Sequence, residues 1–305
     1  MRMRKKKNLI PRMERCAAQL IRDPYDRRGH WRELMPQARE LRLELGCGKG
    51  RFTAGTAAAE PDVLFIAVER VPDAMVMAME RCAAQELHNV FFVDGDVAQL
   101  PLFFAPGEVD RIYINFCDPW PSNRHAKRRL THGNFLKLYR QVLKMGGQIH
   151  FKTDNQPLFE FSVEELPKFG FELSEVTRNL HENGPVGVMT DYEAKFYEQG
   201  QPINRCVGTM VDWEEPEVPE EADFGLAING DSMEPRYHDN QAVWVQQTNS
   251  LSNGEIGIFN LDGMTYCKQL KDDKDGVYLV SLNSKYEPIK VTDESSFKIF
   301  GRVLN

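Results

Sequence analysis

The sequence predicts an α/β protein with a Rossmann-like parallel sheet, followed by a second, small all-β domain. Over the first two thirds of the chain, short apolar runs alternate with helical patterns, which is typical of a parallel sheet covered by helices on both faces. The acidic, proline-containing stretch 213–222 lacks a periodic apolar face and is expected to be a linker. After it, short β-rich runs are separated by turn residues. We therefore expect one domain at residues 1–212 and another at 223–305.

The first domain contains five strand candidates and three helix candidates. The strands are expected at residues 41–45, 63–68, 90–93, 111–116 and 148–152, and the helices at 51–59, 72–86 and 134–144. Pro72 suits a first helical turn, and Gly146-Gly147 suits the end of the last helix. In such a sheet, ligands bind at the carboxyl ends of the strands.

The second domain has the pattern of a small antiparallel sheet. Its strand candidates lie at residues 242–246, 255–259, 265–270 and 277–282. Asp262-Gly263 falls between two of these runs and is a hairpin signal.

The charges of the two domains differ in sign. The chain has 38 Lys and Arg against 45 Asp and Glu; residues 212–305 hold 8 of the basic and 18 of the acidic ones, which leaves 30 basic and 27 acidic residues in 1–211. Within residues 1–32 there are 11 basic and 3 acidic residues. A polyanionic partner therefore suits the first domain and not the second.

Other classes of protein are disfavoured by the sequence. No apolar stretch has the length of a transmembrane helix, and the basic N-terminus lacks the apolar core of a signal peptide, so we expect a cytoplasmic protein without membrane contact. The six cysteines are scattered, with no CxxC pair or Cys/His cluster. A metal site or a disulfide framework is therefore not expected. The sequence does not indicate an oligomeric state.

A glycine-rich loop and three acids predict the cofactor site. The expected strand 41–45 runs into Gly46, Gly48 and Gly50, a pattern that also occurs in tight turns without a ligand. Glu44 precedes this loop and would repel a pyrophosphate, which disfavours NAD, whereas it would attract the cationic groups of S-adenosylmethionine (SAM). Glu69 ends the next strand, where an acid can accept hydrogen bonds from ribose hydroxyls.

The third acid, Asp96, follows the third strand. Its carboxylate, or neighbouring backbone such as that of Val97, could meet the adenine edge. Each acid alone could be a solvated loop residue, but three acids at the ends of successive strands favour a SAM site.

The fourth strand ends in N-F-C-D-P-W-P, residues 115–121, which is followed by a basic run. D-P-W-P-x-x-R-H-x-K-R-R-L resembles the signature of the bacterial tRNA (guanine-N7-)-methyltransferases, which are class I SAM-dependent enzymes. The similarity continues in K-T-D at 152–154, in T-D-Y-E-A-K-F at 190–196 and in G-Q-P-I at 200–203. It covers residues 1–212.

This resemblance implies roles for individual residues. Asp118 is assigned a catalytic role and lines the SAM site with Glu44, Glu69 and Asp96. Positions that contact the substrate guanine in the family match Asp154, Thr190, Asp191, Tyr192 and Glu193. The family usually has lysine where this chain has Ser122, and Arg124 and Lys127 are close enough in sequence to compensate.

The chemistry of guanine N7 fits these residue types. N7 is an exposed acceptor with no proton to remove, so positioning matters more than a general base. Asp118 and Asp154 could stabilise the positive charge that develops on the methylated ring. Phe116 and Trp120 could stack on a base or pack in the protein. The residues expected to bind tRNA phosphates are Arg124, Lys127, Arg128 and Arg129.

The second domain contains G-D-S-M-E-P at 230–235 and a lysine on a later strand run. This pattern resembles the catalytic domain of LexA-type repressors and signal-peptidase-like Ser/Lys proteases. The resemblance implies that Ser232 is a nucleophile and Lys268 its general base, provided that burial keeps the lysine neutral. Autocleaving members carry an Ala-Gly bond before the serine; between residues 206 and 230 this chain has none. A purely structural domain therefore stays open.

Three functions remain as alternatives. The first is methyl transfer from SAM to N7 of guanine in tRNA. The second is a SAM-sensing regulatory protein whose Ser/Lys protease domain is the working part; the basic run after Asp118 argues against it. The third is an amino-methyltransferase acting on DNA, which the tryptophan of D-P-W and the basic run disfavour.

Overall fold

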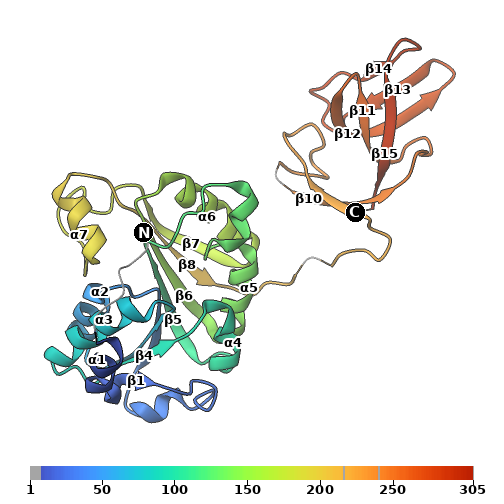
Figure 1. Cartoon of the computed structure of the whole chain (residues 1–305). Helices are drawn as coiled ribbons and strands as arrows, with labels where there is room; N and C mark the ends of the chain where they lie inside the picture. Colours follow the sequence, from blue (N-terminus) through green and yellow to red (C-terminus); the bar gives the residue numbers. More distant parts are fainter. Residues whose placement is uncertain (1–7, 216, 240, 305) are drawn as a thin grey trace. The chain divides into compact units, whose positions relative to one another are not determined.

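In a computed structural model, the chain divides into two compact units, residues 1–214 and 215–305, which are treated separately below (Figure 1). The structure describes residues 8–215, 217–239 and 241–304. Residues 1–7 of the basic N-terminal segment and residue 216 of the expected linker lie outside this description. Trp213, the first residue of the expected linker, still packs on the first unit, where its ring lies 5.8 Å from that of Phe169.

The first unit is built on an eight-stranded sheet with the order β1-β4-β3-β2-β5-β6-β8-β7. All pairs up to β6 are parallel, and β8 runs antiparallel to both of its neighbours. The strands are β1 (Leu20–Ile21), β2 (Glu40–Leu45), β3 (Val63–Glu69), β4 (Val90–Asp94), β5 (Val109–Asn115), β6 (Leu143–Thr153), β7 (Phe171–Thr177) and β8 (Asn204–Met210). This reversal of strand order beside β2 is the Rossmann-like arrangement expected, and the predicted fold class is confirmed.

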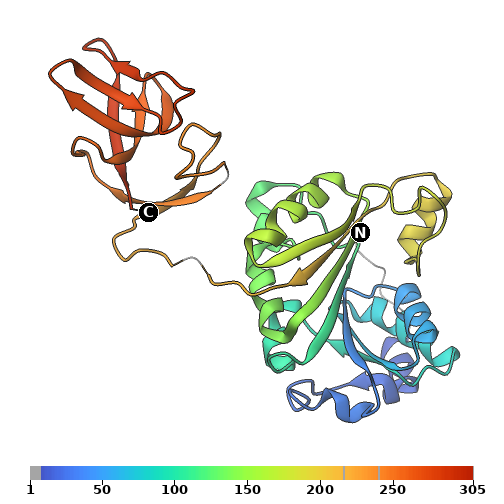
Figure 2. The same ribbon diagram turned by 180° about the vertical axis from the view of Figure 1, so that it is seen from behind.

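Helices cover both faces of the sheet (Figures 1 and 2). They are α1 (Leu9–Arg15), α2 (Arg51–Ala59), α3 (Pro72–Ala84), α4 (Leu100–Phe103), α5 (Gly133–Val142), α6 (Gln156–Lys168) and α7 (Asp191–Glu198). Short 3₁₀ turns lie at η1 (Ala17–Gln19), η2 (Trp31–Leu34), η3 (Val97–Gln99) and η4 (Asn123–Arg128). None of the helices formed by the described residues is long and apolar enough to cross a membrane.

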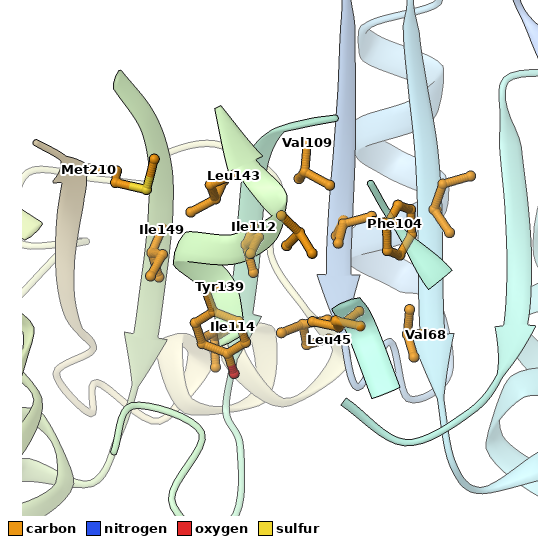
Figure 3. Close-up of a cluster of buried hydrophobic side chains, with 14 of the residues drawn as sticks. Leu45, Val68, Phe104, Val109, Ile112, Ile114, Tyr139, Leu143, Ile149 and Met210 are labelled. Atoms are coloured by element: carbon orange, nitrogen blue, oxygen red, sulfur yellow. The ribbon is translucent and has the colours of Figure 1, made fainter. Parts of the chain in front are cut away.

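The alternation of side chains along β3 divides the core into two layers. Leu64, Ile66 and Val68 belong to the cluster under α4, α5 and α6, part of which is drawn in Figure 3. Val63 and Phe65 point to the opposite face and pack with α2 and α3. Because successive strand residues face opposite sides, a strand that is apolar throughout can fill both layers.

The helix expected at 134–144 ends earlier than predicted. α5 stops at Val142, and β6 begins at once with Leu143. Gly146 therefore lies within the strand, with φ at 75°, rather than closing a helix. The prediction that the glycine pair ends a helix was therefore wrong, because both glycines lie inside β6.

The second unit is a seven-stranded, wholly antiparallel sheet with the order β14-β13-β12-β11-β15-β10-β9. Its strands are β9 (Phe224–Ala227), β10 (Ala242–Gln247), β11 (Ile256–Leu261), β12 (Met264–Asp273), β13 (Gly276–Val280), β14 (Ile289–Val291) and β15 (Phe297–Val303). The predicted hairpin is confirmed: Leu261 pairs with Met264, and Asp262 and Gly263 both have positive φ, as a tight two-residue turn requires. The strands β9, β14 and β15 were not predicted.

Candidate functional site

The register of the parallel strands brings the predicted cofactor residues to one edge of the first sheet. Leu45 of β2 pairs with Val68 of β3 and with Ile114 of β5, and Glu69 of β3 pairs with Asp94 of β4. The residues that follow these strands therefore emerge side by side at their carboxyl ends.

The glycine loop needs glycine at all three positions. Gly46, Gly48 and Gly50 have φ of 79°, 54° and 76°, a region that other residues rarely adopt. A Cβ on Gly50 would lie 2.4 Å from the Cβ of Ala78, so this glycine also lets α3 approach the loop. Cβ atoms on Gly46 or Gly48 would meet nothing within 4 Å. The loop therefore presents bare backbone to the space at the end of the sheet.

Glu44 is almost fully enclosed beneath this loop. Its exposed fraction is 1%, and it accepts hydrogen bonds from the Thr53 hydroxyl and, at 3.4 Å, from the Asn115 amide. Burial raises the pKa of Glu44 to about 7, although these hydrogen bonds and the charge of Lys152 oppose the rise. Both hydrogen-bond partners are neutral, so a nearby cation would stabilise the ionised carboxylate.

The Glu69 carboxylate accepts two hydrogen bonds from the backbone. Its Oε2 accepts from Gly48 N at 3.0 Å and its Oε1 from Val71 N at 2.9 Å. These bonds fix the carboxylate against the glycine loop and leave each oxygen a second lone pair for a hydroxyl.

Asp96 caps the turn η3. Its side chain accepts from Ala98 N at 2.9 Å, and Gln99 returns a side-chain contact to the Asp96 backbone. The backbone at Asp96 and Val97 is thereby held at the carboxyl end of β4.

The loop that carries Asp118 has an unusual backbone. Phe116 and Trp120, two residues to either side, have φ of 53° and 43°. Such conformations are costly for bulky residues and cluster at functional sites. Asp118 itself is exposed at the end of β5. The aromatic rings pack on protein: Phe116 lies 6.5 Å from Phe196, and Trp120 lies 5.8 Å from His125.

Arg129 differs from the prediction that it binds phosphate. It is buried, and its guanidinium donates to the carbonyl of Pro119 at 3.2 Å and to that of Trp120 at 3.1 Å. Because two unpaired carbonyls of the strained loop need a donor, this arginine holds the Asp118 loop instead of facing solvent.

The other predicted phosphate ligands stand at the surface. Arg128 lies 4.9 Å from the centre of the Trp120 ring. In this run, Ser122, Arg124, Lys127 and Arg128 are exposed, as is His125.

Glu193 also differs from its predicted role as a guanine contact. It is fully buried, and its Oε2 lies 2.7 Å from Lys152 Nζ while its Oε1 lies 3.0 Å from His181 Nε2. With both oxygens enclosed by protein donors, the carboxylate has no surface to offer a base. The capping box that it forms with Thr190 uses the Thr190 hydroxyl as well.

The remaining predicted substrate residues lie near this network. Asp191 pairs with Arg81 at 3.1 Å, and Tyr192 is exposed at the start of α7 with its ring 5.7 Å from Phe196. Asp154 is exposed directly after β6.

Sequence reasoning missed four side chains that shape this site. They are Thr53, Asn115, Lys152 and His181, all of which are buried. Lys152 stands in the K-T-D motif and Asn115 directly precedes the Asp118 loop, but only burial shows that they act as partners of carboxylates.

The second unit places Ser232 and Lys268 in contact. Lys268 Nζ lies 2.6 Å from Ser232 Oγ. Lys268 comes from the middle of β12 and is buried, and burial lowers its pKa. The loop around Ser232 is held by Asn283, whose backbone N–H donates to the Ser232 carbonyl with an N···O distance of 3.1 Å. Ser232 and Lys268 line a pocket of about 570 Å³. Among the described residues, no group of histidine, cysteine and acidic side chains could hold a metal ion.

Comparisons with known proteins agree with both halves of this picture. Residues 38–206 match the family model described as a putative methyltransferase, and residues 195–304 match the one described as Peptidase S24-like. Among solved structures, the chain resembles a 16S rRNA (adenine(1408)-N(1))-methyltransferase from Catenulisporales acidiphilia at 16% identity, with a TM-score of 0.47 over 63% of this chain and 95% of the other.

Curated relatives are much more similar in sequence. The tRNA (guanine-N(7)-)-methyltransferase of Geobacillus thermodenitrificans (strain NG80-2) is 44% identical over 207 residues, which are 68% of this chain and 96% of that protein. The protein of the same name from Bacillus cytotoxicus is 40% identical over 67% of this chain and 95% of its own length. This chain therefore belongs to the tRNA (guanine-N(7)-)-methyltransferase family and carries a Peptidase S24-like segment at its C-terminal end.

Proposed function

We propose that the first unit transfers a methyl group from SAM to N7 of guanine in tRNA. The observation that carries this proposal is the meeting of the glycine loop, buried Glu44 and exposed Asp118 at one edge of the sheet, in a chain of this family. A SAM-sensing protein without methyl transfer would not need the exposed basic run beside Asp118.

The residues present fit SAM as the cofactor, which supplies the electrophilic methyl group. The bare backbone at Gly46 and Gly48 admits a ligand, and the Glu44 carboxylate favours a cation. Glu69 is oriented by Gly48 N and Val71 N so that its free lone pairs can accept from ribose hydroxyls. Backbone at Asp96 and Val97 would border the adenine.

The acids at the reaction end act on the substrate ring. Guanine N7 already carries a lone pair, so the chain needs only to orient it and exclude water. Asp118 and Asp154, which are both exposed where neighbouring strands end, would stabilise the positive charge that develops on the ring. Tyr192, Asp191 and Thr190 at the start of α7 would border the base, whereas Glu193 acts from within the protein.

The tRNA backbone would be bound by exposed cations next to this site. The proposed phosphate ligands are Arg124, Lys127 and Arg128, with Ser122 offering a hydroxyl where the family usually has lysine. To test the proposal, the full chain is incubated with labelled SAM and, in parallel, with tRNA, DNA or protein acceptors. Label in tRNA alone supports it; label in DNA or protein but not in tRNA would contradict it.

The second unit carries a separate candidate function, peptide hydrolysis by Ser232 and Lys268. The contact of 2.6 Å and the burial that lowers the pKa of Lys268 are what a Ser/Lys pair requires, since only neutral lysine can accept the serine proton. We propose that this unit acts on a peptide in trans or on the linker, since no Ala-Gly bond lies between residues 206 and 230. Labelling of Ser232 by a serine-directed acylating probe tests this; an unlabelled serine in folded protein would refute it.

A further inference from the structure

We infer that His181 is a positioning residue for methyl transfer. Through Glu193 and Lys152, it holds α7 and the loop 182–189 against the edge of the sheet that carries Asp118. We call this chain of contacts the link. The inference rests on the proposed function and adds to it a residue outside the motifs that carry the family resemblance. His181 lies in the segment after β7, and Lys152 lies near the end of β6.

The link is centred on the Glu193 carboxylate. Glu193 has an exposed fraction of 0%, and a carboxylate without water must take its hydrogen bonds from protein. His181 Nε2 lies 3.0 Å from Oε1, while Lys152 Nζ at 2.7 Å and Thr190 N at 3.1 Å serve Oε2. Removal of any one donor leaves buried negative charge less well satisfied.

The tautomer of His181 follows from its second contact. Val186 N lies 3.1 Å from His181 Nδ1, and because a backbone N–H can only donate, Nδ1 must accept. The proton of the neutral ring is then on Nε2, which donates to Glu193. His181 therefore ties the backbone of the loop 182–189 to α7 with one hydrogen bond at each ring nitrogen. The Tyr197 ring of α7 packs 5.2 Å away at 71°.

The other end of the link reaches the Asp118 loop. Lys152 Nζ also lies 3.3 Å from the carbonyl of Val188, and the Lys152 carbonyl accepts from Phe116 N at 2.9 Å. Phe116 is the strained residue at the start of that loop. One lysine thus joins the loop 182–189, the helix α7 and the backbone that presents Asp118.

A groove of about 500 Å³ lies between the parts that this link joins. One wall is formed by Gly187, Val188 and Met189 of the loop, and another by Tyr197 of α7, with Arg51 at the start of α2 beside them. If the link were broken, the walls of this groove and Tyr192 at the start of α7 would lose their fixed position relative to Asp118. Errors of position of about 1 Å can lower a reaction rate on the order of a hundredfold.

The test uses three variants of the full chain. His181→Phe keeps a ring beside Tyr197 but removes both hydrogen bonds, and His181→Gln restores one donor and one acceptor. Arg178→Gln is the matched control: Arg178 lies three residues before His181, and the change breaks its exposed ion pair with Glu160. Each variant is measured by hydrogen–deuterium exchange of α7, by calorimetry with SAM, and by kcat and KM for tRNA.

We expect His181→Phe to speed exchange in α7 while β6 remains protected. Its kcat should fall on the order of 10- to 100-fold and its KM for tRNA should rise, with the affinity for SAM unchanged. His181→Gln should recover much of the loss, and Arg178→Gln should resemble the wild type in all three measurements. A simple loss of folded protein would instead lower the apparent kcat without changing KM.

Two results would overturn the inference. One is α7 exchange at the wild-type rate in His181→Phe; the other is faster exchange with kcat and KM unchanged. A wild-type chain that transfers no methyl group to tRNA would refute the proposed function instead, and the exchange measurement would still report on the link itself.

Discussion

Replacement of Glu44 by glutamine gives the most quantitative test of the cofactor site. Burial raises the pKa of Glu44 from an ordinary 4.5 to about 7, which corresponds to about 3 kcal/mol of penalty for the ionised form. Because the folded-state pKa lies above the unfolded-state value, this group stabilises the fold most below pH 4.5 and loses that contribution as the pH rises through about 7. The free energy of unfolding of the wild type should therefore fall by about 3 kcal/mol relative to Glu44→Gln between pH 4.5 and pH 8.

Binding of SAM should depend on pH in the opposite direction from the free energy of unfolding, because it should strengthen as Glu44 ionises. A cation favours ionised Glu44, so the Kd of the wild type should rise about tenfold for each pH unit below 7. Glu44→Gln should bind roughly 10- to 100-fold more weakly at pH 8, as expected for loss of a charged partner, and should lack this pH dependence. The glutamine can be accommodated, because Asn115 Oδ1 is buried without a partner among the described residues and could accept from it.

Calorimetric titration with SAM from pH 5.5 to 8.5 measures this dependence. Thr53→Val is the matched control: it removes a hydrogen bond that lowers the pKa of Glu44, so the pH dependence should move to higher pH. Equal affinity and equal pH dependence in wild type and Glu44→Gln would refute the assignment of Glu44 to the cofactor site.

Three further changes test the reaction loop, the tRNA surface and the second unit. Asp118→Ala should lower the rate of methyl transfer about a hundredfold, which corresponds to about 3 kcal/mol. Its Tm should change little, because the side chain is exposed. A normal rate of transfer in single-turnover kinetics would contradict this prediction. Arg128→Gln should reduce the salt slope of tRNA binding by about 0.7 to 0.9 for the lost phosphate contact, whereas Arg129→Gln should lower Tm because two loop carbonyls lose their donor. Proteolysis by the wild type, measured by intact mass, should increase with pH as Lys268 loses its proton and should vanish in Ser232→Ala. Equal cleavage by both proteins would show that a contaminant is responsible.

Much of the first unit could be predicted from periodicity alone. The buried strands read as apolar runs, and their order along the chain placed Glu44, Glu69 and Asp118 at strand ends that the parallel register brings together. The boundary between α5 and β6 was wrong because no turn separates them: Val142 ends the helix and Leu143 begins the strand. A glycine pair marks a break in conformation but does not say whether it lies between elements or inside a strand.

The site residues that differ from prediction are charged groups whose environment decides their role. Arg129 belongs to a basic run that indicates a phosphate-binding surface, yet it is buried and donates hydrogen bonds to two carbonyls of the strained loop. Glu193 belongs to a motif that implies a substrate contact, yet Lys152 and His181 enclose it. These two partners of Glu193 come from β6 and from the segment after β7, and no local sequence pattern predicts their contact with it.

The central claim is that this chain methylates N7 of guanine in tRNA, and identification of the modified base tests it most directly. Mixed tRNA is incubated with SAM and the full chain, and the product is digested to nucleosides and identified by mass and by chemical cleavage at N7-methylguanine. The account predicts N7-methylguanine in tRNA treated with the wild type and about a hundredfold less transfer by Asp118→Ala. Methylation at another atom or another base, or equal N7 methylation by the wild type and Asp118→Ala, would contradict it.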